Sequence, residues 1–204
     1  MSRFGMTIDL ERCIGCHTCA IACKAQNNVP MGMLWNRILT ESEEDGLDCP
    51  QGVYPNLTKS WRPVACQHCE NAACVKVCPV GATYKDENGR VLIDYKLCIG
   101  CRFCMAACPY NARVFNWQKP VYQPGFSYGD VAERPVGIVE KCSMCKELTD
   151  KNLKPACVAA CPANARKFGD LDDENSEVSK LIRQKNSHQL LSELGTKPQT
   201  HYLR

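Results

Sequence analysis

The sequence predicts an α+β fold in which two small modules repeat one cysteine pattern. Sixteen of the seventeen cysteines fall into four sets of four, and three of these sets end in Cys-Pro. The apolar β-branched run Val91-Leu92-Ile93 indicates a strand between two of the sets. With only five Phe and three Trp among 204 residues, the supply of large apolar side chains is modest. We therefore expect something besides side chains to fill the centre of the protein.

The composition excludes several classes of protein. A net charge of +3 is too mild to indicate nucleic-acid binding. No apolar run approaches the roughly 18–20 residues that span a bilayer. Residues 1–9 lack the charged and long apolar regions of an export signal, and they lack a twin-arginine pair. We expect no nucleic-acid partner, no direct membrane span and no export signal in this chain.

The cysteines repeat one ligand pattern along the chain. The first and third sets follow Cys-x2-Cys-x2-Cys-x3-Cys, the second lengthens the middle gap by two residues, and the fourth lengthens it to eleven. The first two sets are Cys13, Cys16, Cys19 and Cys23, then Cys66, Cys69, Cys74 and Cys78. The last two sets are Cys98, Cys101, Cys104 and Cys108, then Cys142, Cys145, Cys157 and Cys161.

This spacing suits a [4Fe–4S] cluster, in which each of four iron corners needs one thiolate. The loop with the first three cysteines curls around three corners, and in two-cluster ferredoxins the fourth cysteine ligates the neighbouring cluster. We expect the fourth cysteine to begin a helix, because proline tolerates the first helical turn. The first set has Lys24 instead of this proline, which leaves its ligand count intact. The pattern therefore predicts four [4Fe–4S] clusters.

Zinc and disulfides are the alternative uses of many cysteines. Zinc sites normally need two Cys-x2-Cys pairs, and disulfide scaffolds of this density are usually much shorter secreted chains. A degraded site with three irons or none is a further alternative, although all sixteen ligands are present. Cys49 stands outside the pattern in a turn-rich loop, and we expect it to be a free thiol.

The second and third sets are separated by about the length of a short hairpin, with its turn at 87–90 and a strand at 91–93. This layout favours a ferredoxin-like module over 60–109. The first and fourth sets then form a second module from the distant segments 1–59 and 110–175. Proximity in the sequence would equally permit pairing of the first set with the second and of the third with the fourth.

Three segments complete the predicted layout. Ile8-Asp9 and Lys167-Phe168-Gly169 would supply edge strands of the discontinuous module. The segment 115–140 is rich in Pro, Gly and aromatic residues, which indicates an irregular insertion that packs on the chain or faces a partner. The tail, 176–204, contains one helix near 177–184 and then an extended stretch that wraps either its own domain or a neighbour.

Other chemically active residues lie near the cysteines. His17 and His68 lie inside cluster loops, where we expect hydrogen bonding or partner contact rather than ligation, because each set already has four thiolates. Positive side chains could raise reduction potentials or be ordinary solvated charges. These are Lys24, Lys76, Arg102 and Arg113. We find no nucleophile–base pair, no G-x-G-x-x-G and no phosphate loop, so we expect no active site in this chain.

These motifs together resemble a known family. From about Phe4 to the tail, the chain is similar to the four-cluster iron–sulfur subunits of the molybdopterin oxidoreductases, of the dimethyl sulfoxide, polysulfide, tetrathionate and arsenate reductase type. The motifs that carry the resemblance are Cys13-Ile14-Gly15-Cys16 after Ile8-Asp9, Cys66-Gln67-His68-Cys69-Glu70-Asn71, Cys98-Ile99-Gly100-Cys101-Arg102, Lys141-Cys142-Ser143-Met144-Cys145, and Cys161-Pro162 followed by Phe168-Gly169-Asp170-Leu171.

The resemblance implies a nested set of ligands. The first cluster would take Cys13, Cys16, Cys19 and Cys161, and the second would take Cys23, Cys142, Cys145 and Cys157. The third would take Cys66, Cys69, Cys74 and Cys108, and the fourth would take Cys78, Cys98, Cys101 and Cys104. Nitrate-reductase-like members of the family have Trp where this chain has Cys101, and formate-dehydrogenase-like relatives carry a C-terminal membrane helix that this chain lacks.

The resemblance also implies the partners. The first cluster would face a molybdopterin (Mo or W) catalytic subunit, and the fourth would face a quinone-reactive membrane anchor. The chain would then be membrane-associated through these subunits, with the extracytoplasmic face favoured. A free-standing polyferredoxin that acts as a soluble carrier is the rival interpretation, and a structural zinc module is a weaker third.

Overall fold

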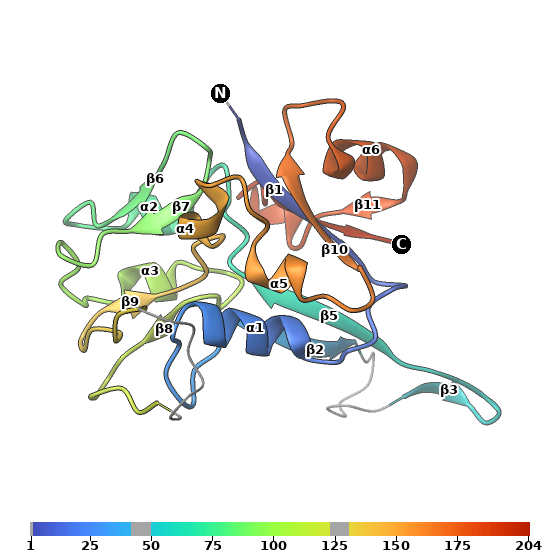
Figure 1. Cartoon of the computed structure of the whole chain (residues 1–204), viewed down its shortest axis with the longest axis horizontal. Helices are drawn as coiled ribbons and strands as arrows, with labels where there is room; N and C mark the ends of the chain where they lie inside the picture. The colour runs from blue at the N-terminus through green and yellow to red at the C-terminus, as the bar shows by residue number, and fades with distance from the viewer. Residues whose placement is uncertain (1, 42–49, 123–130) are drawn as a thin grey trace.

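The computed structural model describes residues 2–41, 50–122 and 131–204, which form the predicted α+β fold of short helices and small sheets (Figure 1). Its helices are α1 (Thr18–Gln26), α2 (Ala73–Lys76), α3 (Phe103–Ala106), α4 (Lys146–Thr149), α5 (Ala156–Ala159), α6 (Glu177–Gln184) and the 3-10 turn η1 (Ser192–Leu194). The strands of the largest sheet are β1 (Phe4–Asp9), β10 (Arg166–Asp170), β11 (Ser187–His188) and β12 (Thr200–Leu203). The remaining strands are β2 (Asn36–Glu41), β3 (Gln51–Val53), β4 (Asn56–Thr58), β5 (Ser60–Ala65), β6 (Thr83–Lys85), β7 (Val91–Ile93), β8 (Val114–Phe115) and β9 (Val139–Glu140).

The largest sheet joins the two ends of the chain. Its strand order is β10-β1-β12-β11, with β1 antiparallel to β10 and parallel to β12. Ile8 lies opposite Arg166 and Thr7 lies opposite Lys167, so the two strands predicted beside the first and fourth cysteine sets pair directly. The sequence left open where the tail packs, and the structure places it on its own chain.

Helix α6 covers this sheet at the point where the sequence predicts a helix. The hydroxyl of Ser176 accepts a hydrogen bond from the Ser179 amide (3.2 Å), which satisfies one free donor of the first turn. Val178 is fully buried and lies over Gly169 of β10. The helix therefore stabilises β10, the strand that follows the fourth cysteine set in the chain.

The other sheets are two-stranded. The predicted hairpin is present as β6–β7, with Thr83 opposite Ile93. Strands β2 and β5 form a longer antiparallel ribbon that was not predicted from the sequence, and this ribbon crosses the boundary expected at residue 59. Strands β3 and β4 form an arm that projects from the body of the molecule (Figure 1).

The predicted insertion and the loop with Cys49 are described only in part. Strands β8 and β9 pair with each other at the two ends of the predicted insertion, and its described residues carry no other helix or strand. Residues 123–130 and the loop with Cys49 lie outside the described residues.

The expectation that the fourth cysteine of each set begins a helix is wrong. Cys23 lies inside α1, and Cys78, Cys108 and Cys161 each lie two residues beyond the last residue of the one-turn helices α2, α3 and α5. Proline disfavours helical backbone angles in the residue that precedes it, so each of these short helices ends before the Cys-Pro pair. The proline then occupies a turn instead of a helix.

The hydrophobic core is small and includes cysteines. One cluster of buried side chains combines Met6, Ile8, Leu10 and Tyr202 with Cys19 and Cys157. A second combines Cys23 with Val29 and Trp35. Within the described ranges, no helix has both the length and the apolar character needed to cross a membrane.

Candidate metal centres

The first group of thiols forms between the start of the chain and the end of the fourth set. Its members line one pocket, and they are Cys13, Cys16, Cys19 and Cys161. The loop from β1 to α1 turns through two left-handed residues, Gly15 (φ 67°) and His17 (φ 59°). A side chain at Gly15 would collide with Trp61, so the loop can take this path only because glycine has no Cβ.

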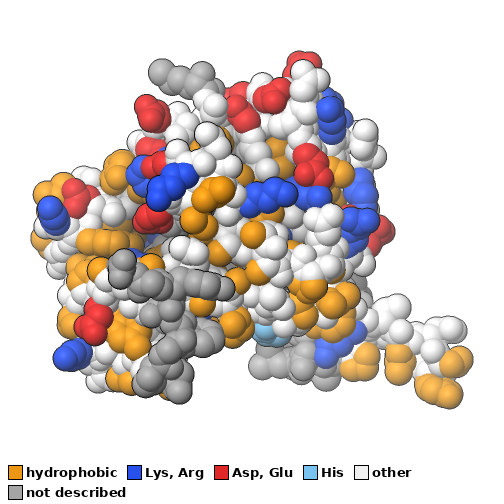
Figure 2. Space-filling view, in the orientation of Figure 1, with side chains coloured by type: hydrophobic (Ala, Val, Ile, Leu, Met, Phe, Trp, Pro, Cys, Tyr) orange, Lys and Arg blue, Asp and Glu red, His pale blue; other side chains and the backbone are white. Residues whose placement is uncertain are grey.

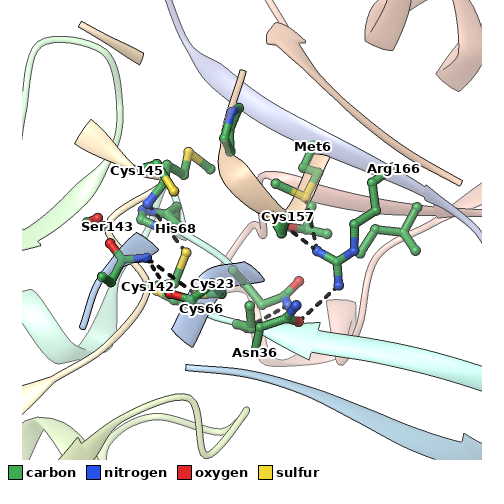
Figure 3. A pocket seen from close by; sticks show the side chains of 17 residues that line it. Met6, Cys23, Asn36, Cys66, His68, Cys142, Ser143, Cys145, Cys157 and Arg166 are labelled. Atoms are coloured by element: carbon green, nitrogen blue, oxygen red, sulfur yellow. Dashed lines mark hydrogen bonds between the residues drawn. The ribbon is translucent and has the colours of Figure 1, made fainter. Parts of the chain in front are cut away.

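The second group lies at the centre of the molecule. Helix α1 packs against α5, and this contact brings a cysteine of the first set to three cysteines of the fourth. The pocket is lined by Cys23, Cys142, Cys145 and Cys157, and also by Cys66 (Figure 3). The side-chain amide of Asn27 donates to the Cys23 carbonyl (2.8 Å) and lies 3.6 Å from the Cys23 sulfur.

The third group consists of four thiols that interact electrostatically with one another. They are Cys66, Cys69, Cys74 and Cys108. Burial, together with the three neighbouring thiols, raises the pKa of Cys69 to about 12. Burial alone would also raise the pKa of Cys66, but His68, Lys141 and Arg113 outweigh it and hold that pKa well below its usual range.

The fourth group lines a separate pocket. Its members are Cys78, Cys98, Cys101 and Cys104. Gly100 (φ 68°) and Arg102 (φ 64°) repeat the left-handed turns of Gly15 and His17 at the same positions of the loop. The internal repeat seen in the sequence is therefore a repeat of backbone geometry.

Backbone amides donate to several of the sulfurs. The amide of Met144 lies 3.4 Å from the Cys142 sulfur, that of Ala165 lies 3.3 Å from Cys161, and that of Thr83 lies 3.5 Å from Cys78. Hydrogen bonds of this kind stabilise a thiolate over a thiol and tune the potential of a bound cluster.

The donor set fits iron–sulfur clusters. Each group offers four thiols, which are soft ligands suited to such clusters. Within the described part of the chain, no group of three or more His, Cys, Asp and Glu side chains is arranged to hold a metal ion. A cluster instead accepts each thiolate at a separate corner. Burial and the neighbouring Cys157 thiol raise the pKa of Cys145 to about 11, so iron must displace protons when it binds these groups.

The two histidines differ in position. His17 is exposed at the mouth of the first pocket, whereas His68 is fully buried between the second and third groups. The Val91 amide donates to His68 Nδ1 (3.1 Å), and burial lowers the pKa of the ring. Because Nδ1 accepts this hydrogen bond, the ring carries a proton on Nε2, and His68 also interacts with the Cys66 thiol.

The basic residues predicted near the cysteines also differ. Arg113 is buried beside the thiols of the third group, whereas Arg102 lies 4.5 Å from the ring centre of Trp117. Lys24 donates to the carbonyls of Pro30 and Met33, and Lys76 donates to Asn71. Two further buried cations, Arg166 and Lys141, were not predicted from the sequence. The repeat Cys-Pro-x-Asn-Ala-Arg, at 108–113 and 161–166, is the signal that could have identified Arg166.

Two family models match the chain. One describes a 4Fe-4S dicluster domain and matches residues 57–124 and 129–171, and the other describes a 4Fe-4S binding domain and matches residues 4–25. These matches confirm the predicted [4Fe–4S] cofactors, and the sixteen grouped cysteines are enough for four of them.

The chain is also similar to named proteins over nearly its whole length. It is 57% identical to a Halobacterium salinarum protein assigned as the iron–sulfur subunit of a dimethyl sulfoxide reductase, with 100% of this chain and 79% of the relative covered. It is 39% identical to the arsenate respiratory reductase iron–sulfur subunit of a Shewanella species (99% and 96% covered). It is 37% identical to the iron–sulfur cluster-binding subunit of menaquinone reductase from Nitratidesulfovibrio vulgaris (98% and 88% covered). The chain therefore belongs to the family of [4Fe–4S] electron-transfer subunits of the molybdopterin oxidoreductases.

Proposed function

We propose that this chain relays single electrons through four [4Fe–4S] clusters, between a quinol-oxidising membrane subunit and a molybdopterin catalytic subunit. The observation that carries this proposal is the grouping of the thiols. Each of the four groups contains three cysteines from one set and one from another. When bound, each cluster supplies a site that accepts and releases one electron.

The proposed ligands are the members of the four groups. They are Cys13, Cys16, Cys19 and Cys161 for the first cluster, Cys23, Cys142, Cys145 and Cys157 for the second, Cys66, Cys69, Cys74 and Cys108 for the third, and Cys78, Cys98, Cys101 and Cys104 for the fourth. The groups are neighbours in this order. Arg166 lines both the first and second pockets, and Cys66 of the third group also lines the second. Arg113 interacts with Cys74 of the third group and Cys104 of the fourth.

We also propose that these groups define two ferredoxin-like modules. Residues 1–59 and 110–175 would form the module of the first and second clusters, and 60–109 would form that of the third and fourth. The β2–β5 ribbon then joins the modules across their boundary, because its strands come from both.

Exposed apolar side chains at both ends support docking to two partners. Ile99 and Phe103 are 64% and 62% exposed beside the fourth group, where we place the membrane subunit. Ile14 is 59% exposed beside the first group, where we place the catalytic subunit. The β3–β4 arm ends in Val53 and Tyr54, which are 81% and 84% exposed and give the arm its apolar tip (Figure 2). Docked partner subunits would cover these exposed apolar side chains.

The complex would be attached to the membrane through the quinone-reactive subunit, on the extracytoplasmic side. Relatives named as iron–sulfur subunits of reductases support a fixed partner rather than a free carrier. A brown monomer, purified without a large molybdenum- or tungsten-containing chain, would support the polyferredoxin alternative.

Cys101→Ser tests the placement of the fourth cluster. We expect this substitution to perturb that cluster in electron paramagnetic resonance (EPR) spectra and to slow turnover driven by quinol at least about tenfold, while turnover driven by an artificial dye is retained, because only quinol must deliver its electrons through the membrane end. Cys49→Ser is the matched control and leaves the iron content unchanged. Loss of dye-driven turnover with quinol-driven turnover intact would refute this placement.

A further inference from the structure

Within the described residues, three cations are buried beside the cysteine groups and have no carboxylate partner. Arg166, Lys141 and Arg113 are only 2%, 3% and 3% exposed. Among residues 2–41, 50–122 and 131–204, none of the ion pairs includes any of the three. A buried charge is strongly unfavourable unless a buried opposite charge accompanies it. The anions that remain to balance these three cations are the thiolates of the four groups and the clusters that they hold.

Arg166 lies between the first and second groups. Its Nη1 contacts the sulfur of Cys157 (3.8 Å) and that of Met6 (3.5 Å), and its Nη2 donates to Asn36 Oδ1 (2.9 Å) (Figure 3). The same guanidinium lines the pocket of the first group and interacts with the thiols of Cys13 and Cys19. One fixed charge therefore faces two cluster sites.

Arg113 occupies the equivalent place between the third and fourth groups. Both arginines end a Cys-Pro-x-Asn-Ala-Arg repeat, in which Asn111 (φ 46°) and Asn164 (φ 51°) make the same left-handed turn. Arg113 interacts with the thiols of Cys74 and Cys66 on one side and of Cys104 on the other. Its Nη1 donates to Thr83 Oγ1 (3.3 Å), and its buried Nη2 has no partner within the described residues.

Lys141 lies at the remaining junction, between the second and third groups. Its ammonium donates to two neutral acceptors, the carbonyls of Val91 and Cys142, the second at 2.8 Å. Cys142 belongs to the second group, and Lys141 also interacts with the Cys66 thiol of the third. Each junction between successive groups therefore holds one buried cation.

We propose that Arg166, Lys141 and Arg113 are fixed counter-charges, each of which raises the reduction potentials of the two clusters that it faces. This inference rests on the cluster ligands assigned under the proposed function. A cluster with four thiolates is anionic and gains a further negative charge on reduction, so a nearby buried cation stabilises the reduced form more than the oxidised form. Because each cation faces two clusters, it raises the reduction potentials of both the donor and the acceptor in one electron-transfer step.

The test compares Arg166→Gln with Arg113→Gln. Glutamine keeps hydrogen-bonding groups and removes the charge, and each variant is the matched control for the other because both change the same position of the repeat. The readout is an EPR-monitored redox titration of the iron-loaded chain in its complex. We expect Arg166→Gln to lower two of the four midpoint potentials and Arg113→Gln to lower the other two. Lys141→Gln should lower one potential from each of these pairs.

Arg166→Lys and Arg113→Lys, which keep the charge, separate electrostatics from packing. If a glutamine variant loses its two clusters while the lysine variant retains them near their normal potentials, the requirement for charge is supported. The proposal is overturned if all four clusters are present with unchanged potentials, if all four potentials shift together, or if the lysine variant behaves like the glutamine variant. Failure of the four-cluster proposal itself would differ, because the unmodified chain would then contain far fewer than about sixteen irons.

Discussion

Single residues with unusual backbone angles fix the shape of each cluster loop. Gly15 and Gly100 have positive φ angles at equivalent positions, and neither has room for a methyl group. A Cβ on Gly100 would lie 2.1 Å from the Gly137 carbonyl oxygen, which is backbone and cannot rotate away. The glycine in each of these loops is therefore required by both angle and space.

Gly100→Ala tests this requirement against Gly81→Ala. Gly81 has a similar φ of 66° but nothing within 4 Å of its Cβ position, so it reports the angular strain alone. We expect Gly81→Ala to destabilise by about 1 kcal/mol, or about 2–4 °C in the midpoint of thermal cluster loss. Gly100→Ala should cost at least about 2–3 kcal/mol, because the steric clash adds to the strain. Equal effects of the two substitutions would show that the clash with Gly137 is unimportant.

At the scale of elements, the tail and α6 stabilise the sheet that carries the first cluster loop. Strand β12 pairs with β1 directly before that loop, and α6 packs on β10, β1 and β12. Tyr202 of β12 is fully buried, and its hydroxyl donates to the Pro63 carbonyl (2.8 Å) of the β2–β5 ribbon. The C-terminal segment thereby connects the sheet to the ribbon.

Val178→Ala measures how much α6 contributes. Removal of two methyl groups from this fully buried side chain should destabilise the protein by about 2 kcal/mol through the cavity that remains. Amide hydrogen exchange should accelerate in β10 and β12. The exposed Lys180→Ala on the same helix should change stability by less than about 0.5 kcal/mol. Unchanged exchange in both strands would argue against this role of α6.

At the scale of the whole molecule, the clusters take the place of much of the core. Among the described residues, the larger of the two clusters of buried apolar side chains has only seven members, and two of these are the ligand candidates Cys19 and Cys157. Without iron the grouped thiols lie close to one another, and burial together with neighbouring thiols raises the pKa of Cys69 to about 12 and that of Cys145 to about 11. Folding and iron binding should therefore be coupled.

Proton release and pH dependence follow from this coupling. The raised pKa values mean that these thiols are protonated in the iron-free chain at neutral pH, and each must lose its proton to bind iron. Reconstitution with iron and sulfide in weak buffer should release protons. Cluster absorbance should fall as the pH is lowered from about 8 to about 5, because protons compete with iron for the thiolates. Cluster retention that does not depend on pH over this range would contradict the prediction.

Some features were predictable because they depend on neighbours in the chain. The Cys-x2-Cys spacing, the turn before Val91 and the apolar face around Val178 are local patterns, and the hairpin β6–β7 and helix α6 follow from them. The β2–β5 ribbon was missed, because the segment that joins its strands contains turn signals at 47–52 that conceal a long-range pairing. Lys141 was missed because nothing in the sequence around it distinguishes a buried lysine from a solvated one.

The sequence by itself determined which sixteen sulfurs are available and which cofactor suits them, because ligand type and short spacing are properties of a few adjacent residues. Only the tertiary structure decided which thiols share a pocket, since the position of Cys23 beside Cys142 and Cys157 depends on the packing of α1 against α5. It also decided that Arg166 and Arg113 lie between neighbouring groups. Burial and the distance to a second group arise only when remote segments pack together.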